Sequence, residues 1–104
     1  MTVVIVQTPR LNLSPDRLFA MGKYNKLLLQ ILRGTSDANI SFNDLCNLLI
    51  NIGFEERTRG SHHMFRKENI LEKINLQRDG NKAKVYQIRQ VRTIILKYSL
   101  GEEI

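Results

Sequence analysis

Residue types that build cross-linked or metal-held scaffolds are scarce in this sequence of 104 residues. It has one cysteine, Cys46, and only two histidines. A single cysteine excludes an internal disulfide and a zinc site built on several cysteines. Because Cys46 lies among Leu45, Leu48 and Leu49, we expect a small buried thiol rather than a nucleophile.

Long apolar runs are also absent. No stretch approaches the ~20 apolar residues that a membrane-spanning helix needs. The run Val3-Val4-Ile5-Val6 is too short for the core of a signal peptide, and Pro9 interrupts the segment soon afterwards. Together with the lone thiol, which suits a reducing compartment, these absences predict a cytoplasmic protein with no membrane partner.

Several catalytic motifs are missing as well. The acidic pairs Glu55-Glu56 and Glu102-Glu103 stand apart in the sequence, so we expect no carboxylate cluster to hold magnesium. There is no glycine-rich phosphate loop and no serine nucleophile elbow. We therefore expect any chemistry to be independent of metals and cofactors.

Positive charge is what the sequence has in excess, with a net charge of +6. The stretch 57–97 holds eleven of the 16 Lys and Arg residues but only three of the 10 Asp and Glu residues, which leaves +8 there and −2 elsewhere. A basic half beside a slightly acidic half indicates a polyanionic partner, most often nucleic acid. A solvated basic surface without a partner is the alternative.

Apolar periodicity and turn residues divide the chain into a short series of elements. We expect helices over 22–33, 41–53 and 84–101, strands over 54–59, 61–67 and 71–77, and a turn over 78–81. Ser41 with Asp44 three residues later predicts a capped start for the second helix. Residues 1–20 contain both prolines and no clear period, so we expect a poorly ordered N-terminal extension.

The expected fold class is α+β, with a single domain over 21–104. One additional N-terminal helix precedes a helix, three antiparallel strands and a final helix. The apolar stripes of the helices bury against one face of the sheet and leave the other face open. In the last helix we expect an apolar stripe and an opposite basic face, made respectively of Val85, Ile88, Val91, Ile95 and Tyr98, and of Arg89, Arg92 and Lys97.

The segment Arg59-Gly60-Ser61-His62-His63-Met64-Phe65-Arg66 holds both histidines in one strand-like run. Side chains alternate along a strand, so His63 shares a face with Phe65 and His62 shares the other with Met64. If Phe65, the larger apolar side chain, enters the core, His62 projects onto the open face; if Met64 does, the assignment is reversed. Adjacent histidines on opposite faces chelate one metal poorly, and no third ligand is evident. A purely structural histidine is the alternative at either position.

A histidine beside a basic surface suits chemistry on RNA. A neutral imidazole can remove the proton of a ribose 2′-hydroxyl, whose oxygen then attacks the adjacent phosphorus. The phosphorane needs positive charge nearby, and the closest cations in sequence or across the sheet are Arg59, Arg66 and Lys73. The expected RNA contacts are Arg59, Ser61, Arg66, Lys73, Lys82 and Lys84.

Over about residues 41–100 the chain resembles the HicA family of toxins from bacterial toxin–antitoxin pairs. The resemblance rests on Leu49-Ile50-Asn51-Ile52-Gly53-Phe54 at a helix end, on Gly60-Ser61-His62-His63-Met64-Phe65-Arg66, and on Val91-Arg92-Thr93-Ile94-Ile95-Leu96-Lys97 in a basic last helix. It implies a fold like the double-stranded-RNA-binding domain and an endoribonuclease, an mRNA interferase that degrades mRNA and arrests growth. It also implies a hetero-oligomer with a HicB-like antitoxin that covers the active site. The family's catalytic histidine corresponds to His62, with His63 as the second choice.

Two features depart from the family pattern. The helix expected over 22–33 and the extension over 1–20 make the chain longer than many family members. The segment Leu76-Gln77-Arg78-Asp79-Gly80 stands where the family often has a proline followed by a histidine. Two alternatives therefore stay open, a non-catalytic RNA-binding module of the same fold and an interaction protein whose basic face serves only an acidic partner.

Overall fold

The computed structural model describes residues 22–101, and the extension expected over 1–20 lies outside this range. Its helices are α3 (Lys23–Arg33), the 3-10 helix η1 (Asp37–Asn39), α4 (Phe42–Ile52) and α5 (Val85–Tyr98). Its strands are β1 (Glu55–Arg59), β2 (His62–Arg66), β3 (Ile74–Leu76), β4 (Arg78–Asp79) and β5 (Lys82–Ala83). The expected α+β class is confirmed for these residues, with helices before and after antiparallel strands. None of the helices described is long and apolar enough to cross a membrane.

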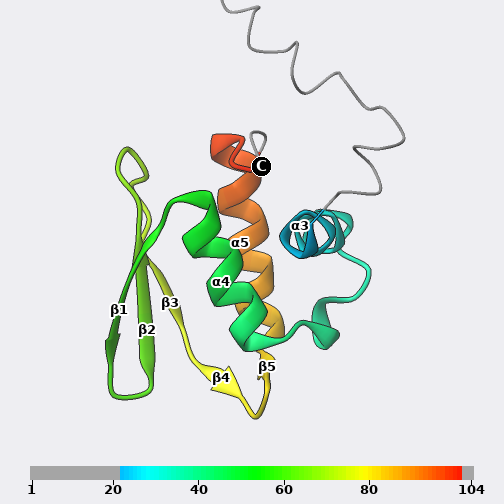
Figure 1. The fold of residues 1–104 in the computed structure, drawn as a ribbon, viewed down its shortest axis with the longest axis horizontal. Coiled ribbons are helices and arrows are strands. Elements are labelled where there is room, and N and C mark those ends of the chain that lie inside the picture. The colour runs from blue at the N-terminus through cyan, green and yellow to red at the C-terminus, as the bar shows by residue number, and fades with distance from the viewer. Residues whose placement is uncertain (1–21, 102–104) are drawn as a thin grey trace, which may run out of the picture.

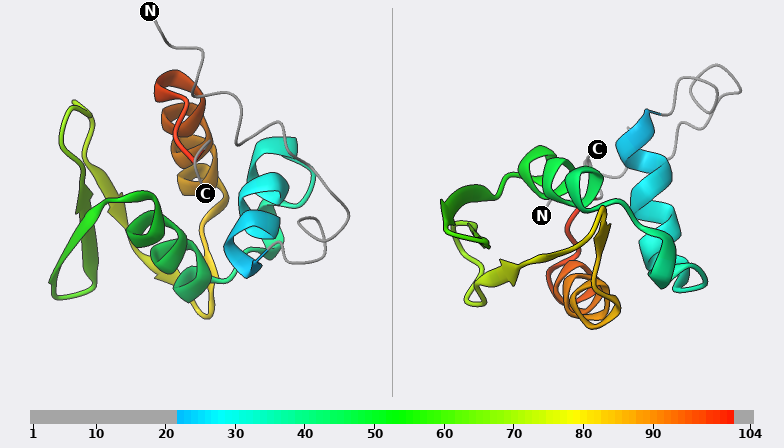
Figure 2. Two further views of the ribbon diagram at one scale, coloured as in Figure 1. Left: turned by 45° about the horizontal axis from the view of Figure 1, so that its top comes forward. Right: turned by 90° about the horizontal axis from the view of Figure 1, so that it is seen from below.

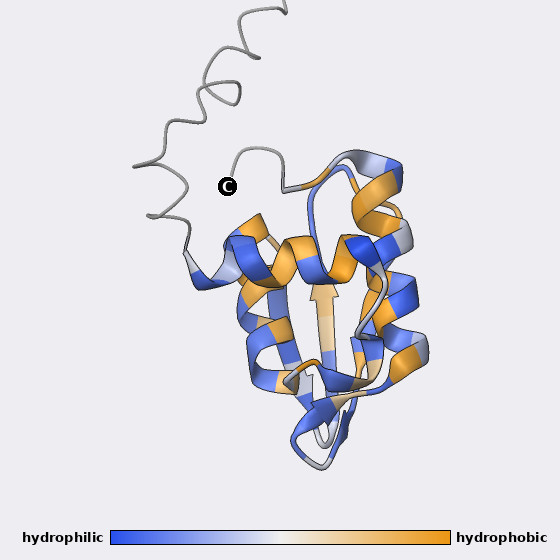
Figure 3. Ribbon diagram, turned by 90° about the vertical axis from the view of Figure 1, so that its right-hand side faces the viewer, coloured by the Kyte–Doolittle hydropathy of each residue, from blue (hydrophilic) through white to orange (hydrophobic). Residues whose placement is uncertain are grey.

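The elements form layers. Figure 1 shows the three-stranded sheet on one side, α4 and α5 in the middle, and α3 on the far side. The views in Figure 2 show the same order, with α4 and α5 between the sheet and α3. Apolar residues of these helices alternate with hydrophilic ones along each ribbon (Figure 3), as expected for helices that bury one face and expose the other.

The start and end of α4 follow from its sequence. The side chain of Ser41 accepts a hydrogen bond from the backbone N–H of Asp44 at 3.2 Å, so the predicted cap is confirmed. Gly53 ends the helix with φ of 118°, a left-handed conformation that glycine adopts without steric cost. Between these ends, Phe42, Leu45 and Leu49 are at most 1% exposed and form part of the core.

One face of the three-stranded sheet closes this core. The strands run antiparallel in the order β1-β2-β3. Phe65, Ile74 and Leu76 point to the helices and are fully buried. Their neighbours Met64 and Asn75 point the other way and are half-buried and exposed, respectively. The prediction of one buried and one open sheet face is therefore confirmed.

The segment after β3 corrects two expectations. Residues 78–81, expected to be a turn only, contain β4 and the turn that joins it to β5 in a second two-stranded sheet, in which Arg78 pairs with Ala83. Gly80 allows this tight hairpin because its φ is 63°. An isolated bridge from Lys82 to Ser41 then ties the hairpin to the start of α4. The third strand is also shorter than expected over 71–77, because the residues before Ile74 reach toward α5 instead of pairing with β2.

Arg92, expected on the basic face of the last helix, is engaged within the fold. Its guanidinium donates to both carboxylate oxygens of Asp37, at 2.9 and 3.0 Å, and to the carbonyl of Ile31 at 2.9 Å. The last carbonyls of a helix lack hydrogen-bond donors within that helix, and Arg92 donates to one such carbonyl at the end of α3. Arg92 also lowers the pKa of Asp37 below its usual range through this hydrogen bonding. Arg92 therefore connects α3, η1 and α5.

Candidate functional site

His62 lies on the open face of the sheet, at the start of β2. Phe65 is fully buried, so the alternation of side chains along β2 puts His62 on the opposite side. His62 is exposed, whereas His63 is half-buried. The expectation that His62 faces outward is therefore confirmed, and its role in chemistry stays a prediction.

Two side chains from the β3 side hold the His62 ring. The Nδ1 atom lies 3.2 Å from Oδ1 of Asn75, an oxygen that can only accept, so Nδ1 carries the hydrogen. The Nε2 atom lies 3.4 Å from the amide nitrogen of Gln77, which can only donate. A neutral ring in this arrangement keeps its lone pair on Nε2, the form that accepts a proton.

Three arginines of β1 and β2 lie on the same sheet face as His62. Arg59 is the direct cross-strand partner of His62, and Arg57 is the partner of Met64; cross-strand partners share a sheet face. Arg66 lies on the same face but opposite Glu55, which partly offsets its charge. Arg57 was not among the predicted RNA contacts, although the alternation of β1 against β2 could have indicated it.

Two other predicted contacts lie beside the same face. Ser61 precedes His62 in the β1–β2 turn, and its hydroxyl accepts a hydrogen bond from the Gln77 amide at 3.2 Å. Gln77 therefore links the turn, the histidine and the end of β3. Lys73 is exposed immediately before β3, two residues from Asn75. The structure thus gathers Arg59, Ser61, Arg66 and Lys73 around the sheet face that carries His62.

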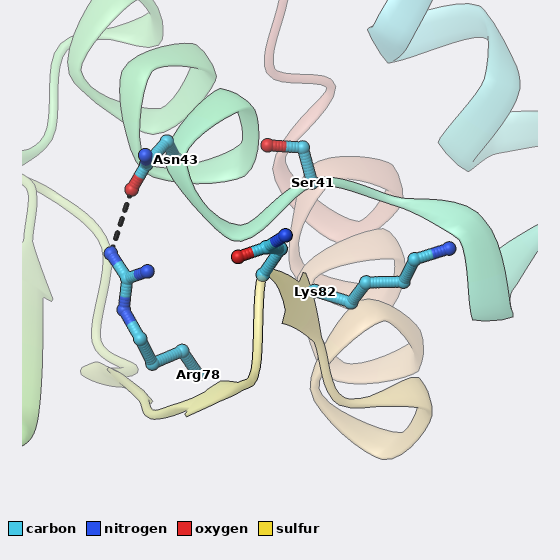
Figure 4. Close-up of a pocket in the computed structure, with 5 residues that line it drawn as sticks. Ser41, Asn43, Arg78 and Lys82 are labelled. Atoms are coloured by element: carbon cyan, nitrogen blue, oxygen red, sulfur yellow. Dashed lines mark hydrogen bonds between the residues drawn. The ribbon is translucent and has the colours of Figure 1, made fainter.

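Lys82 and Lys84 belong to a different part of the molecule. Lys82 lies on β5, and Lys84 is the N-cap residue that precedes α5, so neither is on the three-stranded sheet. Lys82 lines an open pocket of about 380 Å³ together with Ser41, Asn43, Arg78 and Asn81 (Figure 4). The predicted set of RNA contacts is therefore divided between two places.

Arg78 connects that pocket with the sheet. Its guanidinium donates to Oδ1 of Asn43 at 2.8 Å (Figure 4) and stands 4.7 Å from the centre of the Phe42 ring. Phe42 in turn meets the ring of His63 edge-on, with centroids 4.9 Å apart. The Phe42 ring at the start of α4 is thus packed between the guanidinium of Arg78 and the ring of His63.

His63 faces the core side and has its own partners. Its Nδ1 lies 2.7 Å from Oε2 of Glu56, and Thr58 approaches the same nitrogen at 3.5 Å. Glu56 of the acidic pair Glu55-Glu56 thus lies against a histidine of the neighbouring strand. Cys46 of α4 lies beside both groups. Burial raises the pKa of the Cys46 thiol to about 12, so the thiol is protonated and the prediction of a buried, non-nucleophilic cysteine is consistent with the structure.

Not every cation of the basic stretch is free to meet a partner. Lys97 donates to Glu72 at 2.8 Å, and the hydroxyl of Tyr98 donates to the same carboxylate at 2.7 Å. These hydrogen bonds lower the pKa of Glu72 to about 2. Lys97, like Arg92, therefore holds a segment of the fold in place, whereas Arg57 and Arg59 of β1 are exposed on the open sheet face.

Comparison with protein families, curated proteins and solved structures finds no match to this chain. The function is therefore argued from the site itself.

Proposed function

We propose that this protein is an endoribonuclease toxin of the HicA type, in which His62 acts as the general base on RNA held by the open sheet face. The observation that carries the proposal is the exposed His62 ring with Nδ1 against Asn75 and Nε2 turned to the replaceable amide of Gln77. A general base must be within hydrogen-bond reach of the proton it removes. A substrate hydroxyl that displaces the Gln77 amide meets this condition.

The reaction follows from that arrangement. Nε2 of His62 takes the proton of a ribose 2′-hydroxyl, and the freed oxygen attacks the adjacent phosphorus. The bond to the 5′-oxygen breaks, and that oxygen takes a proton from the imidazolium, directly or through water. The products are a 2′,3′-cyclic phosphate and a 5′-hydroxyl. Because Asn75 accepts from Nδ1 in both protonation states, it orients the ring throughout.

Arginine side chains supply the positive charge that the reaction needs. Arg59, the cross-strand partner of His62, is positioned to approach the phosphate under attack, where added negative charge develops. Arg57 and Arg66 lie further along the same face and suit the neighbouring phosphates. Such contacts add affinity without sequence preference, and each one adds to the salt dependence of binding.

The partner and the finer fold assignment belong to the same proposal. The α-β-β-β-α order, with helices on one face of the sheet, supports a fold like that of the double-stranded-RNA-binding domain. The uncovered basic face suits a HicB-like antitoxin, which would block RNA by covering His62 and its arginines. Electrostatic complementarity then favours an antitoxin with an acidic surface at this position.

The test is growth after induction of the protein without a partner, followed by cleavage of a defined RNA in the presence of a chelator. We expect arrest and cleavage with the natural sequence. The His62→Ala variant should lose about 10²- to 10⁴-fold in cleavage rate, the usual contribution of a general base, while retaining RNA affinity. An RNA with a single 2′-deoxy substitution at the cleavage position should resist the natural enzyme.

The matched control is His63→Gln, which changes the neighbouring histidine on the other face. A folded His63→Gln variant should keep most of the cleavage activity. Cleavage by His62→Ala at the natural rate would contradict the catalytic assignment. RNA binding without cleavage by the natural sequence would instead favour the non-catalytic RNA-binding module.

A further inference from the structure

Three rigid elements bring side chains with metal-binding chemistry together on the core side of the sheet. Cys46 lies in the middle of α4, Glu56 on β1 and His63 on β2. One ligand atom from each lies within 4.8 Å of the other two. Helices and strands hold such groups more firmly than loops do, so this grouping is a property of the packed fold.

The local geometry explains why these three meet. Glu56 is the cross-strand partner of Phe65, and His63 is the partner of Thr58, so all four share the face turned to the helices. On α4, Phe42 and Cys46 are four residues apart and lie on one side of the helix. Phe42 rests against the His63 ring, which places the Cys46 thiol over the Glu56–His63 pair.

The donor set matches one class of ion. A thiolate, an imidazole and a carboxylate together suit Zn²⁺ and similar divalent transition metals, whereas Mg²⁺ and Ca²⁺ prefer oxygen alone. Bonds of about 2.0–2.3 Å separate tetrahedral ligands by about 3.5 Å. Small side-chain rotations that open the 2.7 Å contact between Glu56 and His63 and draw in the thiol would meet this requirement.

Solvent reaches one side of the group. The side chains of His63 and Glu56 are 21% and 24% exposed, so an ion can approach them from solvent. The hydroxyl of Thr58 lies 3.5 Å from both Oε2 of Glu56 and Nδ1 of His63. It can orient the carboxylate once that oxygen binds an ion, as groups around metal ligands commonly do.

We infer that Cys46, Glu56 and His63 form a binding site for a single Zn²⁺-class ion that fastens α4 to β1 and β2. On binding, the thiol releases its proton to solvent, and the hydrogen of the neutral His63 ring is carried on Nε2, by exchange through solvent, so that Nδ1 presents its lone pair to the ion. The site lies on the opposite face of β2 from His62, so it is separate from the proposed RNA chemistry. A lone cysteine in the sequence excludes only the familiar sites built on several cysteines.

The test uses the full-length chain, stripped of metal with a chelator and titrated with Co²⁺ as a spectroscopic probe, then with Zn²⁺ in competition. We expect one Co²⁺ per chain with thiolate-to-cobalt charge-transfer absorption, displaced by one Zn²⁺. Zn²⁺ should also raise the melting temperature, because it binds only the folded state. Cys46→Ser should abolish the charge-transfer band, and Glu56→Gln should weaken binding at least tenfold.

Glu55→Gln is the matched control, since Glu55 is the adjacent glutamate on the open face, and it should bind metal as the natural sequence does. His62→Ala should do the same. Absence of the charge-transfer band in the natural chain would overturn the inference. Unchanged affinity in folded Glu56→Gln would overturn it too, and Glu56 is exposed enough for that variant to fold even where Cys46→Ser does not. None of these outcomes depends on RNA cleavage.

Discussion

His62 and His63 are adjacent in the chain, yet they belong to opposite sides of the sheet. His62 is exposed among arginines and polar side chains, with Nδ1 beside Asn75 and Nε2 beside the Gln77 amide. His63 is half-buried against Phe42, Glu56 and the Cys46 thiol. The same residue type therefore faces solvent on one side, where we propose RNA chemistry, and packs against the core on the other, where we propose metal binding. The two environments differ because successive side chains of a strand point to opposite faces of the sheet.

The basic residues divide in a similar way. Arg57 and Arg59 stand on the open face with no carboxylate directly opposite them. Arg92 and Lys97 of α5 are each paired with one acidic residue, Asp37 and Glu72 respectively. Net charge alone does not separate these groups, since all four contribute equally to it. Among the described residues, the first group faces solvent without an ion-pair partner, whereas the second is engaged within the fold.

The largest contrast between the two faces is expected for the apolar residues of β2. Phe65→Ala should lower the free energy of unfolding by about 3–5 kcal/mol, because it leaves a cavity in a fully packed core. Met64→Ala, on the open face, should cost less than about 1 kcal/mol. Denaturant unfolding of both variants measures this. Equal losses would show that the open face is covered by something else in solution.

Substitution of the two histidines should also lower stability more on the core side than on the open face, but by a smaller margin. In metal-free buffer, His63→Ala should cost about 2 kcal/mol, since it removes the edge contact with Phe42 and leaves the half-buried Glu56 carboxylate without its partner. His62→Ala should change stability by no more than about 0.5 kcal/mol, as surface substitutions usually do. A double-mutant cycle with Glu56→Ala isolates the pair. No coupling between positions 56 and 63 would contradict the 2.7 Å contact between them.

The smallest difference is expected between the open-face cation Arg59 and the paired cation Lys97, in the salt dependence of RNA binding. Arg59→Ala should lower the salt slope of RNA binding by about one unit, as the loss of one phosphate contact does. Lys97→Ala should leave that slope unchanged, because Lys97 is engaged with Glu72. Affinities measured at several salt concentrations decide this. If both variants reduced the salt slope equally, positive charge would contribute to RNA binding wherever it lies on the surface, and the open sheet face would not be the specific RNA-binding surface.

Several features could be predicted from the sequence because they depend on near neighbours. The apolar stripes located the three helices, Ser41 and Gly53 marked the ends of α4, and alternation around Phe65 placed His62 outward. The β4–β5 hairpin was missed, since two-residue strands leave no period to detect. The division of the RNA contacts, with Lys82 away from His62, was missed because sequence distance does not report which sheet a residue joins.

The contacts between distant residues were beyond such reasoning. Arg92 meets Asp37 across 55 positions of the chain, and Lys97 meets Glu72 across 25. The group of Cys46, Glu56 and His63 depends on how α4 crosses the sheet, which no local pattern encodes.

The sequence by itself determined the order of the three helices and of the strands of the main sheet, the excess of positive charge and the opposite faces of His62 and His63. These follow from side-chain periodicity, which the backbone imposes on any helix or strand. Only the tertiary structure decided which cations are free, which carboxylate meets His63, and that a lone cysteine lies beside both. These outcomes depend on the packing of elements far apart in the chain, where one side chain's position is set by all the others in the core.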